Sequence, residues 1–185
     1  SIITLELFNK IILIVGFGRI GQSLIKRCKG FDMKIKVYDP YVEKEIIEKF
    51  GGQKIDNLDE GLKDCDYLSL HIPLNDKTKN LIDYSKLSIM KKESILINTA
   101  RGGIVNEEDL NKALKENIIF GAGLDVFEKE PLDKNNSLLS NKKVLLSPHS
   151  ATFTNECKSR MSIETTKNII DFFDNKIDKS MIVKL

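Results

Sequence analysis

Three side chains in the second half of the chain are of the types that bind a carboxylate or move a proton. Arg101 precedes two glycines in a turn after an apolar run, and a guanidinium can hold a carboxylate through two parallel hydrogen bonds. Glu130 precedes His149 by 19 positions, and a carboxylate beside an imidazole stabilises the protonated ring. If these two residues meet in the fold, they can donate a proton near neutral pH. Spacing alone also allows a surface arginine and a structural histidine.

A glycine-rich turn supplies the second chemical feature. Gly16, Gly18 and Gly21 follow the apolar run 11–15 and open a helical pattern, which is the context of a dinucleotide-binding turn. The first glycine allows a tight turn, the second lets the backbone approach a pyrophosphate, and the third lets the helix pack against the sheet. Asp39 ends the next apolar run, where a carboxylate accepts the ribose hydroxyls of NAD and repels the extra phosphate of NADP. The sequence therefore predicts NAD as the cofactor.

Other kinds of site find little support. The second histidine, His71, directly precedes Ile72 and Pro73, so a structural role is favoured, although backbone at this place can line a cofactor groove. Two distant histidines and three scattered cysteines give no metal-ligand cluster, so no metal is expected. No Gly-x-Ser-x-Gly motif supports a serine nucleophile. With an NAD site, hydride transfer fits the polar residues better than hydrolysis.

Composition narrows the class of protein further. The chain has 185 residues, 41% of them hydrophobic, and its 29 basic and 27 acidic residues leave a net charge of +2. This balance indicates neither a nucleic acid partner nor an anionic membrane, and no apolar run approaches the roughly 20 residues of a membrane span. The sequence shows no signal-peptide pattern. Cys28, Cys65 and Cys157 are expected to be buried thiols of a cytoplasmic protein.

The elements that must position these residues alternate between strand and helix. Such alternation predicts an α/β fold with a doubly wound parallel sheet of the Rossmann type, in which ligands bind beyond the carboxyl ends of the strands. Gly30 is expected to form a left-handed helix cap. The last helix carries a wide apolar stripe that needs a cover. The expected strands are 11–15, 35–38, 54–55, 67–70, 95–98, 118–125 and 143–146, and the expected helices are 19–29, 42–50, 59–63, 85–91, 106–116 and 155–175.

Six segments together resemble the D-isomer-specific 2-hydroxyacid dehydrogenases over nearly the whole chain: 16–21, 37–40, 71–74, 98–103, 121–131 and 147–149. The resemblance implies that Arg101 binds the substrate carboxylate and polarises its carbonyl group. It also implies that His149 is the acid or base, with Glu130 as its partner. The implied cofactor-binding residues are Gly16, Gly18, Arg19, Ile20, Gly21, Asp39, His71, Ile72, Pro73, Thr99, Ala100, Arg101, Asp125, His149 and Ala151, with Asp125 on the nicotinamide side.

Within this family, segments 38–41 and 147–152 most resemble the members that act on 3-phosphoglycerate in serine biosynthesis. Reduction of hydroxypyruvate or glyoxylate, a D-lactate-type reaction and a non-catalytic NAD sensor are the alternatives. A sensor has no need of the proton donor His149. Family members carry a separate substrate domain, which is expected to be largely missing here. Residues 1–154 would form the NAD-binding domain, and 155–185 a helix and tail that pack toward the absent domain. A homodimer formed through the cofactor domain is also implied.

Overall fold

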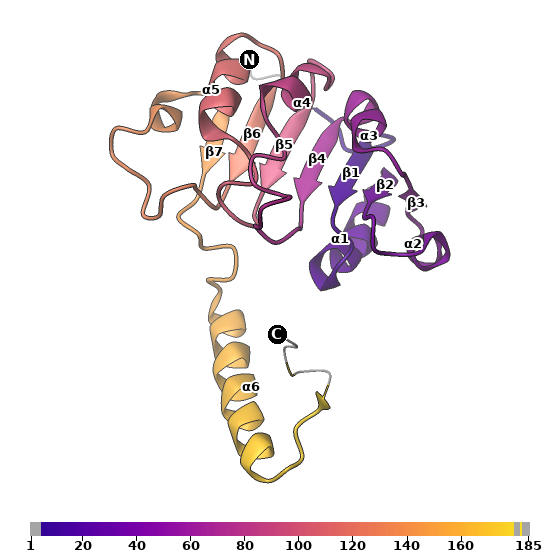
Figure 1. The fold of residues 1–185 in the computed structure, drawn as a ribbon, viewed down its shortest axis with the longest axis vertical. Helices are drawn as coiled ribbons and strands as arrows, with labels where there is room; N and C mark the ends of the chain where they lie inside the picture. Colours follow the sequence, from indigo (N-terminus) through magenta and orange to yellow (C-terminus); the bar gives the residue numbers. More distant parts are fainter. Residues whose placement is uncertain (1–4, 180–181, 183–185) are drawn as a thin grey trace. The chain divides into compact units, whose positions relative to one another are not determined.

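The computed structural model of the chain describes residues 5–179 and 182. In this part of the chain, seven parallel strands form one sheet in the order β3-β2-β1-β4-β5-β6-β7 (Figure 1). The strands are β1 (Ile11–Val15), β2 (Lys34–Tyr38), β3 (Gln53–Lys54), β4 (Tyr67–Leu70), β5 (Ile95–Asn98), β6 (Gly121–Leu124) and β7 (Val144–Leu146). The predicted doubly wound α/β fold is confirmed. Strand order reverses between β1 and β4, and ligands of such sheets bind at this point.

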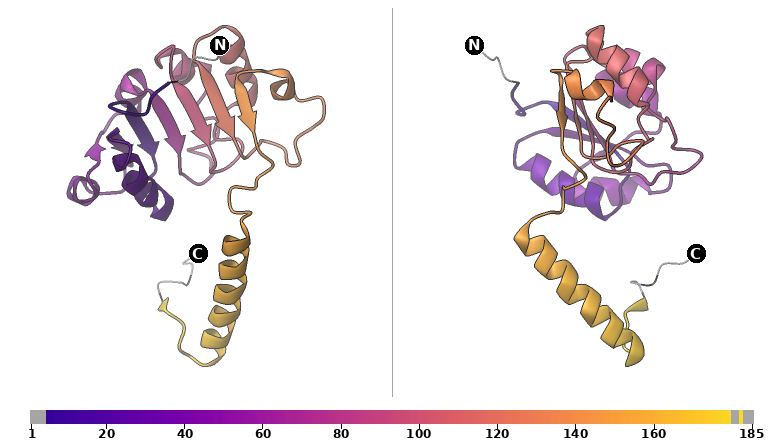
Figure 2. Two further views of the ribbon diagram at one scale, coloured as in Figure 1. Left: turned by 180° about the vertical axis from the view of Figure 1, so that it is seen from behind. Right: turned by 90° about the vertical axis from the view of Figure 1, so that its left-hand side faces the viewer.

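Each face of the sheet has its own hydrophobic core. Along β1, Ile12 and Ile14 face one core, whereas Leu13 and Val15 face the other, because successive side chains of a strand point to opposite faces. The helices α1 (Arg19–Lys29) and α2 (Lys44–Phe50) cover the first face. The helices α3 (Leu58–Asp64), α4 (Tyr84–Ser88) and α5 (Glu107–Lys115) cover the second (Figure 2). The nearly continuous apolar strands are thus explained by burial on both sides.

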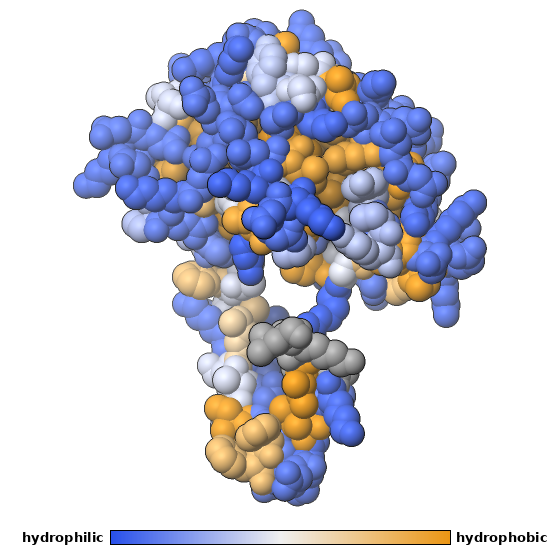
Figure 3. Space-filling model, viewed as in Figure 1, coloured by the Kyte–Doolittle hydropathy of each residue, from blue (hydrophilic) through white to orange (hydrophobic). Residues whose placement is uncertain are grey.

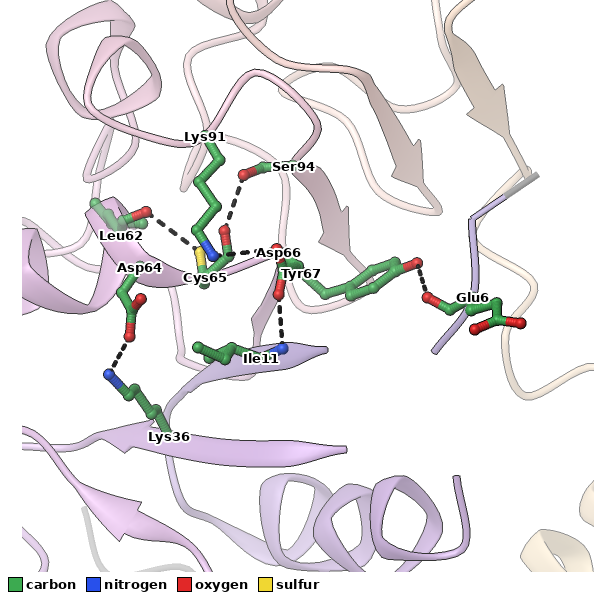
Figure 4. Close-up of polar contacts among 10 residues, drawn as sticks. All are labelled: Glu6, Ile11, Lys36, Leu62, Asp64, Cys65, Asp66, Tyr67, Lys91 and Ser94. Carbon is green, nitrogen blue, oxygen red and sulfur yellow. Dashed lines mark hydrogen bonds and ion pairs between the residues drawn. The ribbon is translucent and has the colours of Figure 1, made fainter. Parts of the chain in front are cut away.

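Polar side chains join neighbouring segments at the amino edge of the sheet. The carboxylate of Asp66 accepts a hydrogen bond from the Ile11 N–H at 2.8 Å and pairs with Lys91 Nζ at 3.1 Å (Figure 4). The hydroxyl of Ser94 donates to the Cys65 carbonyl at 2.9 Å. This edge lies opposite the glycine turn, which follows the carboxyl end of β1. The contacts hold the strands in register at the end away from the candidate site.

Several predicted boundaries were wrong. The expected strand 118–125 is shortened to β6 because the Ile118 N–H still bonds the Ala113 carbonyl, with Asn117 left-handed at φ 59° in a helix-ending turn. Gly30 is not a left-handed cap. It stays right-handed at φ −65°, and Asp32 takes the left-handed conformation instead. The expected helix 85–91 is the shorter α4, and its N-cap Asp83 accepts from the Lys86 N–H.

The chain from Ser150 onward forms a second compact unit. Its helix α6 (Asn155–Phe173) begins after Thr154, whose hydroxyl accepts from the Cys157 N–H at 3.1 Å. None of the α6 residues is buried, so Cys157 is half-buried rather than buried as expected. The predicted apolar stripe is exposed, and apolar surface is visible on this unit in Figure 3. Each predicted member is more than half exposed, and so is Ile163 of the same helix; the predicted members are Met161, Ile169, Ile170, Phe172 and Phe173.

No helix in the described part of the chain combines the length and the hydropathy needed to cross a bilayer.

Candidate active site

The glycine turn is built from backbone contacts that exclude side chains. Gly16 has a φ of +97°, and a Cβ on it would lie 2.5 Å from the His71 carbonyl oxygen. A Cβ on Gly21 would lie 2.3 Å from the carbonyl oxygen of Gly16, so the start of α1 packs directly on the turn. Gly18 differs, because a Cβ there would meet nothing within 4 Å. The space in front of Gly18 is open, at the N-terminus of a helix whose dipole favours an anion.

Asp39 holds this turn in place, which the sequence did not reveal. Its Oδ2 accepts a hydrogen bond from the Phe17 N–H at 2.8 Å, and its Oδ1 accepts from the Tyr41 N–H at 2.9 Å. Phe17 itself is buried and packs edge-on against Phe50. A carboxylate has about four lone-pair sites, so Asp39 keeps capacity for further donors.

A groove of about 460 Å³ runs beside the turn. It contains six of the predicted cofactor-binding residues: Gly16, Gly18, Asp39, His71, Ile72 and Pro73. The His71 ring contacts the Ser69 hydroxyl through Nε2 at 2.9 Å, and burial lowers the pKa of His71. His71 therefore combines the structural and the groove-lining roles. Arg19 and Ile20, also predicted, are exposed on the first turn of α1.

The turn that carries Arg101 is held by a buried amide. Asn98, the last residue of β5, is 2% exposed. Its Nδ2 donates to the Arg101 carbonyl at 2.9 Å, and its Oδ1 accepts from the Ala100 N–H at 3.1 Å. Thr99 and the Arg101 side chain are exposed. Sequence reasoning missed the role of Asn98, although an amide that ends a buried strand is the signal that could have indicated it.

Glu130 and His149 meet in the fold. Glu130 Oε2 lies 2.6 Å from His149 Nδ1, and Glu130 Oε1 accepts from the Phe127 N–H at 3.0 Å. The hydrogen bond with His149, followed by that with Phe127, holds the pKa of Glu130 below its usual value near 4.5. A pocket of about 630 Å³ adjoins the pair. It is lined by Phe127, Glu130, Pro131, Leu132, Leu139, Leu146, Ser147, Pro148 and His149.

Asp125 directly follows β6 and contacts the end of β5 and the segment that follows β7. It is 3% exposed, its N–H donates to the Asn98 carbonyl at 3.0 Å, and its Oδ1 accepts from the Ser147 hydroxyl. The role of Ser147 was not predicted, because the contact joins segments 22 residues apart. Ala151 belongs to the second unit, so its place at the cofactor groove stays a prediction.

Within residues 5–179 and 182, no group of three or more His, Cys, Asp or Glu residues could hold a metal ion.

Comparison with known proteins gives this arrangement a context. The sequence model described as "D-isomer specific 2-hydroxyacid dehydrogenase, NAD binding domain" matches residues 1–151. The chain belongs to this family. It is 44% identical to a D-3-phosphoglycerate dehydrogenase of Methanocaldococcus jannaschii, over 83% of this chain and 29% of that protein. It is also 44% identical to a glyoxylate reductase of Thermococcus litoralis, over 95% of this chain and 53% of the relative.

Solved structures agree with the family assignment. The TT0316 protein of Thermus thermophilus superimposes with a TM-score of 0.86 at 32% identity, over 96% of this chain and 55% of that one. A D-isomer specific 2-hydroxyacid dehydrogenase of Lactobacillus delbrueckii, in its NAD complexed form, gives a TM-score of 0.85 at 29% identity, over 98% of this chain and 58% of that one. The chain spans about half the length of most of the proteins it matches here.

NAD is the cofactor of this dehydrogenase domain, and the residues present fit it. The open space at Gly18 leaves room for a pyrophosphate beside backbone N–H groups. The carboxylate of Asp39 lines the same groove and can accept ribose hydroxyls.

Proposed function

We propose that the protein transfers a hydride between NAD and a D-2-hydroxy acid or its 2-oxo acid. The observation that carries this proposal is the 2.6 Å contact between Glu130 and His149, at the carboxyl edge of an NAD-binding sheet. Bound NAD would accept or supply the hydride. The chain itself would supply the proton transfer and the recognition of the substrate carboxylate.

The contact with Glu130 supports a separate role for each nitrogen of the His149 ring. Because Nδ1 faces the carboxylate, Nε2 is left to face the substrate oxygen. In reduction, Nε2 donates a proton to the carbonyl oxygen, and in oxidation it accepts the hydroxyl proton. Arg101 binds the substrate carboxylate and polarises the neighbouring carbonyl group.

Cofactor recognition is assigned to the groove and the neighbouring strand ends. We infer that Gly16, Gly18 and Gly21, with Arg19 and Ile20, hold the pyrophosphate at the start of α1. Asp39 holds the ribose. The remaining contacts are assigned to His71, Ile72, Pro73, Thr99, Ala100, Asp125 and Ala151.

Three substrate classes are supported by the names of relatives. The relative from Methanocaldococcus jannaschii supports 3-phosphoglycerate and 3-phosphohydroxypyruvate as the pair. The relative from Thermococcus litoralis, equally identical and aligned over more of this chain, supports glyoxylate. A D-lactate dehydrogenase of Lactobacillus jensenii, 30% identical with a TM-score of 0.86, supports a third reaction on the same scaffold. NADH oxidation by the full-length protein with phosphohydroxypyruvate, hydroxypyruvate, glyoxylate and pyruvate would rank them.

The decisive experiment is His149→Ala in the full-length protein. Loss of the proton donor should lower kcat by about 10²- to 10⁴-fold while the Kd of NADH stays unchanged. The control is Ser94→Ala, since Ser94 lies at the opposite edge of the sheet and its hydroxyl donates to the Cys65 carbonyl, away from the candidate site. Unchanged turnover in His149→Ala would refute the role of His149. A wild-type protein that binds NADH but reduces none of the four acids would favour the non-catalytic sensor.

We also propose that two parts of the chain have different roles. Residues 1–154 form the cofactor domain, and the exposed apolar side chains of α6 in 155–185 pack against a substrate domain. A homodimer through the cofactor domain is supported by Leu145 and Phe120, which are 79% and 48% exposed on a shallow apolar depression at β5, β6 and β7. Sedimentation of Leu145→Lys beside wild type tests this pairing. A monomeric wild type would exclude it.

A further inference from the structure

The turn that carries Arg101 packs directly on the turn that carries Glu130. A Cβ on Gly102 would lie 1.7 Å from the Phe127 carbonyl oxygen and 2.7 Å from the Glu128 nitrogen, so the two backbones are in contact. The N–H of Phe127 donates to Glu130 Oε1 at 3.0 Å. Phe127 therefore links the two turns, because its carbonyl group faces Gly102 and its N–H bonds Glu130.

This junction is fixed from outside as well. The N–H of Glu107 donates to Glu128 Oε1 at 2.9 Å, and the N–H of Glu128 donates to Glu107 Oε1 at 2.6 Å. These reciprocal bonds attach the turn to the start of α5. Phe127 is 6% exposed and belongs to the core on that face. The Glu130 side of the junction is therefore held by both hydrogen bonds and packing.

On the other side, Asn98 sets the conformation of the Arg101 turn. Its amide donates to the Arg101 carbonyl and accepts from the Ala100 N–H, which only a side chain with both a donor and an acceptor can do. The backbone of the same residue also accepts from Asp125. Asn98 does not need to touch the substrate to influence how it is bound.

We propose that Asn98 is a positioning residue, which sets Arg101 relative to the Glu130–His149 pair through the contact of Gly102 with Phe127. This inference rests on the proposed function. The carboxylate and the C2 oxygen of a 2-oxo acid lie on neighbouring carbons, so the guanidinium and the imidazole must keep a fixed separation. A hydrogen-bonded turn packed on a second turn fixes the backbone positions from which the Arg101 and Glu130 side chains extend.

The test compares two buried side chains, Asn98 at the carboxyl end of β5 and Ser94 just before its start. Asn98→Ala removes both bonds to the Arg101 turn, whereas Ser94→Ala removes one bond to the Cys65 carbonyl (Figure 4). In the full-length protein, Asn98→Ala should lower kcat/KM for the best 2-oxo acid by about 10- to 100-fold, which is the effect of a displacement on the order of 1 Å. The Kd of NADH should change less than kcat/KM does, because only Thr99 to Arg101 among the cofactor-binding residues belong to this turn. Ser94→Ala should lower thermal stability and leave kcat and KM as in wild type.

A double-mutant cycle with Arg101→Ala separates positioning from a purely structural role. If Asn98 acts through Arg101, then Asn98→Ala should cost less than about twofold in the Arg101→Ala background. Oxalate affinity of the NADH complex gives the same cycle without turnover. Should Asn98→Ala fail to fold, Asn98→Ser keeps a hydroxyl that can bond one of the two partners and should show a smaller loss.

The outcomes distinguish the two proposals. Additive losses, or a wild-type kcat/KM in Asn98→Ala, would overturn the role of Asn98 while leaving the dehydrogenase assignment intact. Oxalate binding that does not depend on Arg101 would overturn the role proposed for Arg101 and, with it, the positioning role of Asn98, whatever the turnover of the wild-type protein.

Discussion

Gly18→Ala should separate cofactor binding from folding. Gly18 precedes α1 with φ −72° and ψ −169°, an extended conformation that alanine adopts without strain, and a Cβ there meets nothing within 4 Å. Alanine stabilises by about 0.4–1 kcal/mol through the unfolded state. Alanine is also a poorer N-cap than glycine, and we take this cost as a few tenths of a kcal/mol or more. These terms oppose each other, so the free energy of unfolding should stay within about 1 kcal/mol of wild type.

The effect on NADH should be large by comparison. A methyl group would occupy the open space where the pyrophosphate is proposed to approach the backbone. Losing one hydrogen bond to a charged group costs about 1.5–3 kcal/mol, which corresponds to a roughly 10- to 100-fold higher Kd. Urea denaturation of the 185-residue chain measures the stability, and NADH fluorescence titration measures the affinity.

Two further glycines provide matched controls. Gly123→Ala in β6 also meets nothing within 4 Å, and Gly123 does not line the cofactor groove, so stability and affinity should both be retained. Gly21→Ala places a Cβ 2.3 Å from the Gly16 carbonyl oxygen, so both should be lost. Wild-type NADH affinity in Gly18→Ala would show that no cofactor group approaches this backbone. If Gly18→Ala lost as much stability as Gly21→Ala, the conclusion that a Cβ fits at Gly18 without contacts would be refuted.

Three other perturbations have defined outcomes. Asp39→Asn keeps an oxygen for the Phe17 N–H but removes the negative charge. The ratio of the Kd values of NADPH and NADH, from titrations with both, should therefore be smaller than in wild type. A wild-type protein that binds the two cofactors equally well would contradict this reasoning. The hydrogen bond with His149 lowers the pKa of Glu130, so the ionised carboxylate stabilises the folded chain above the usual pKa near 4.5. This contribution is lost as the pH falls through the folded pKa. The difference in the free energy of unfolding between wild type and Glu130→Gln, measured by urea unfolding at neutral and acid pH, should therefore disappear on the acid side. Burial raises the pKa of Cys65 to about 12, so alkylation followed by mass spectrometry should label Cys157 in the folded chain and Cys65 only after unfolding.

The strands were predictable because burial on both faces leaves a simple pattern. Ile12 to Val15 are apolar at every position, and the glycines after them could be interpreted from their spacing. Element ends were less predictable. Asn117 takes a left-handed conformation that carries the chain out of α5, whereas Gly30, which looks better suited to that conformation, remains right-handed. Both outcomes depend on which backbone groups find partners after the helix, and sequence periodicity does not report this.

The reacting groups of the candidate site were easier to find than their supports. Arg101, Glu130 and His149 have chemical types that are noticed wherever they follow a strand. Asn98 and Ser147 act through contacts, to the Arg101 carbonyl and to Asp125, that exist only once separate segments have come together. The hydrogen bond between Asp39 and the Phe17 N–H could not be predicted from the sequence for the same reason.

Burial nevertheless gives a physical rule by which such supports can be recognised. A buried polar side chain must find a hydrogen-bond partner, because leaving it unpaired costs about 1–3 kcal/mol. Among the described residues, five polar side chains are buried: Ser69, Ser94, Asn98, Asn111 and Asp125. Three of them, Ser69, Asn98 and Asp125, lie at or next to the carboxyl ends of three neighbouring strands, β4, β5 and β6. Each side chain bonds the segment that leaves its own or the next strand: His71, the Arg101 turn and Ser147. A polar residue near the end of an otherwise apolar parallel strand therefore indicates a turn that must keep its shape, and here those turns carry the candidate site.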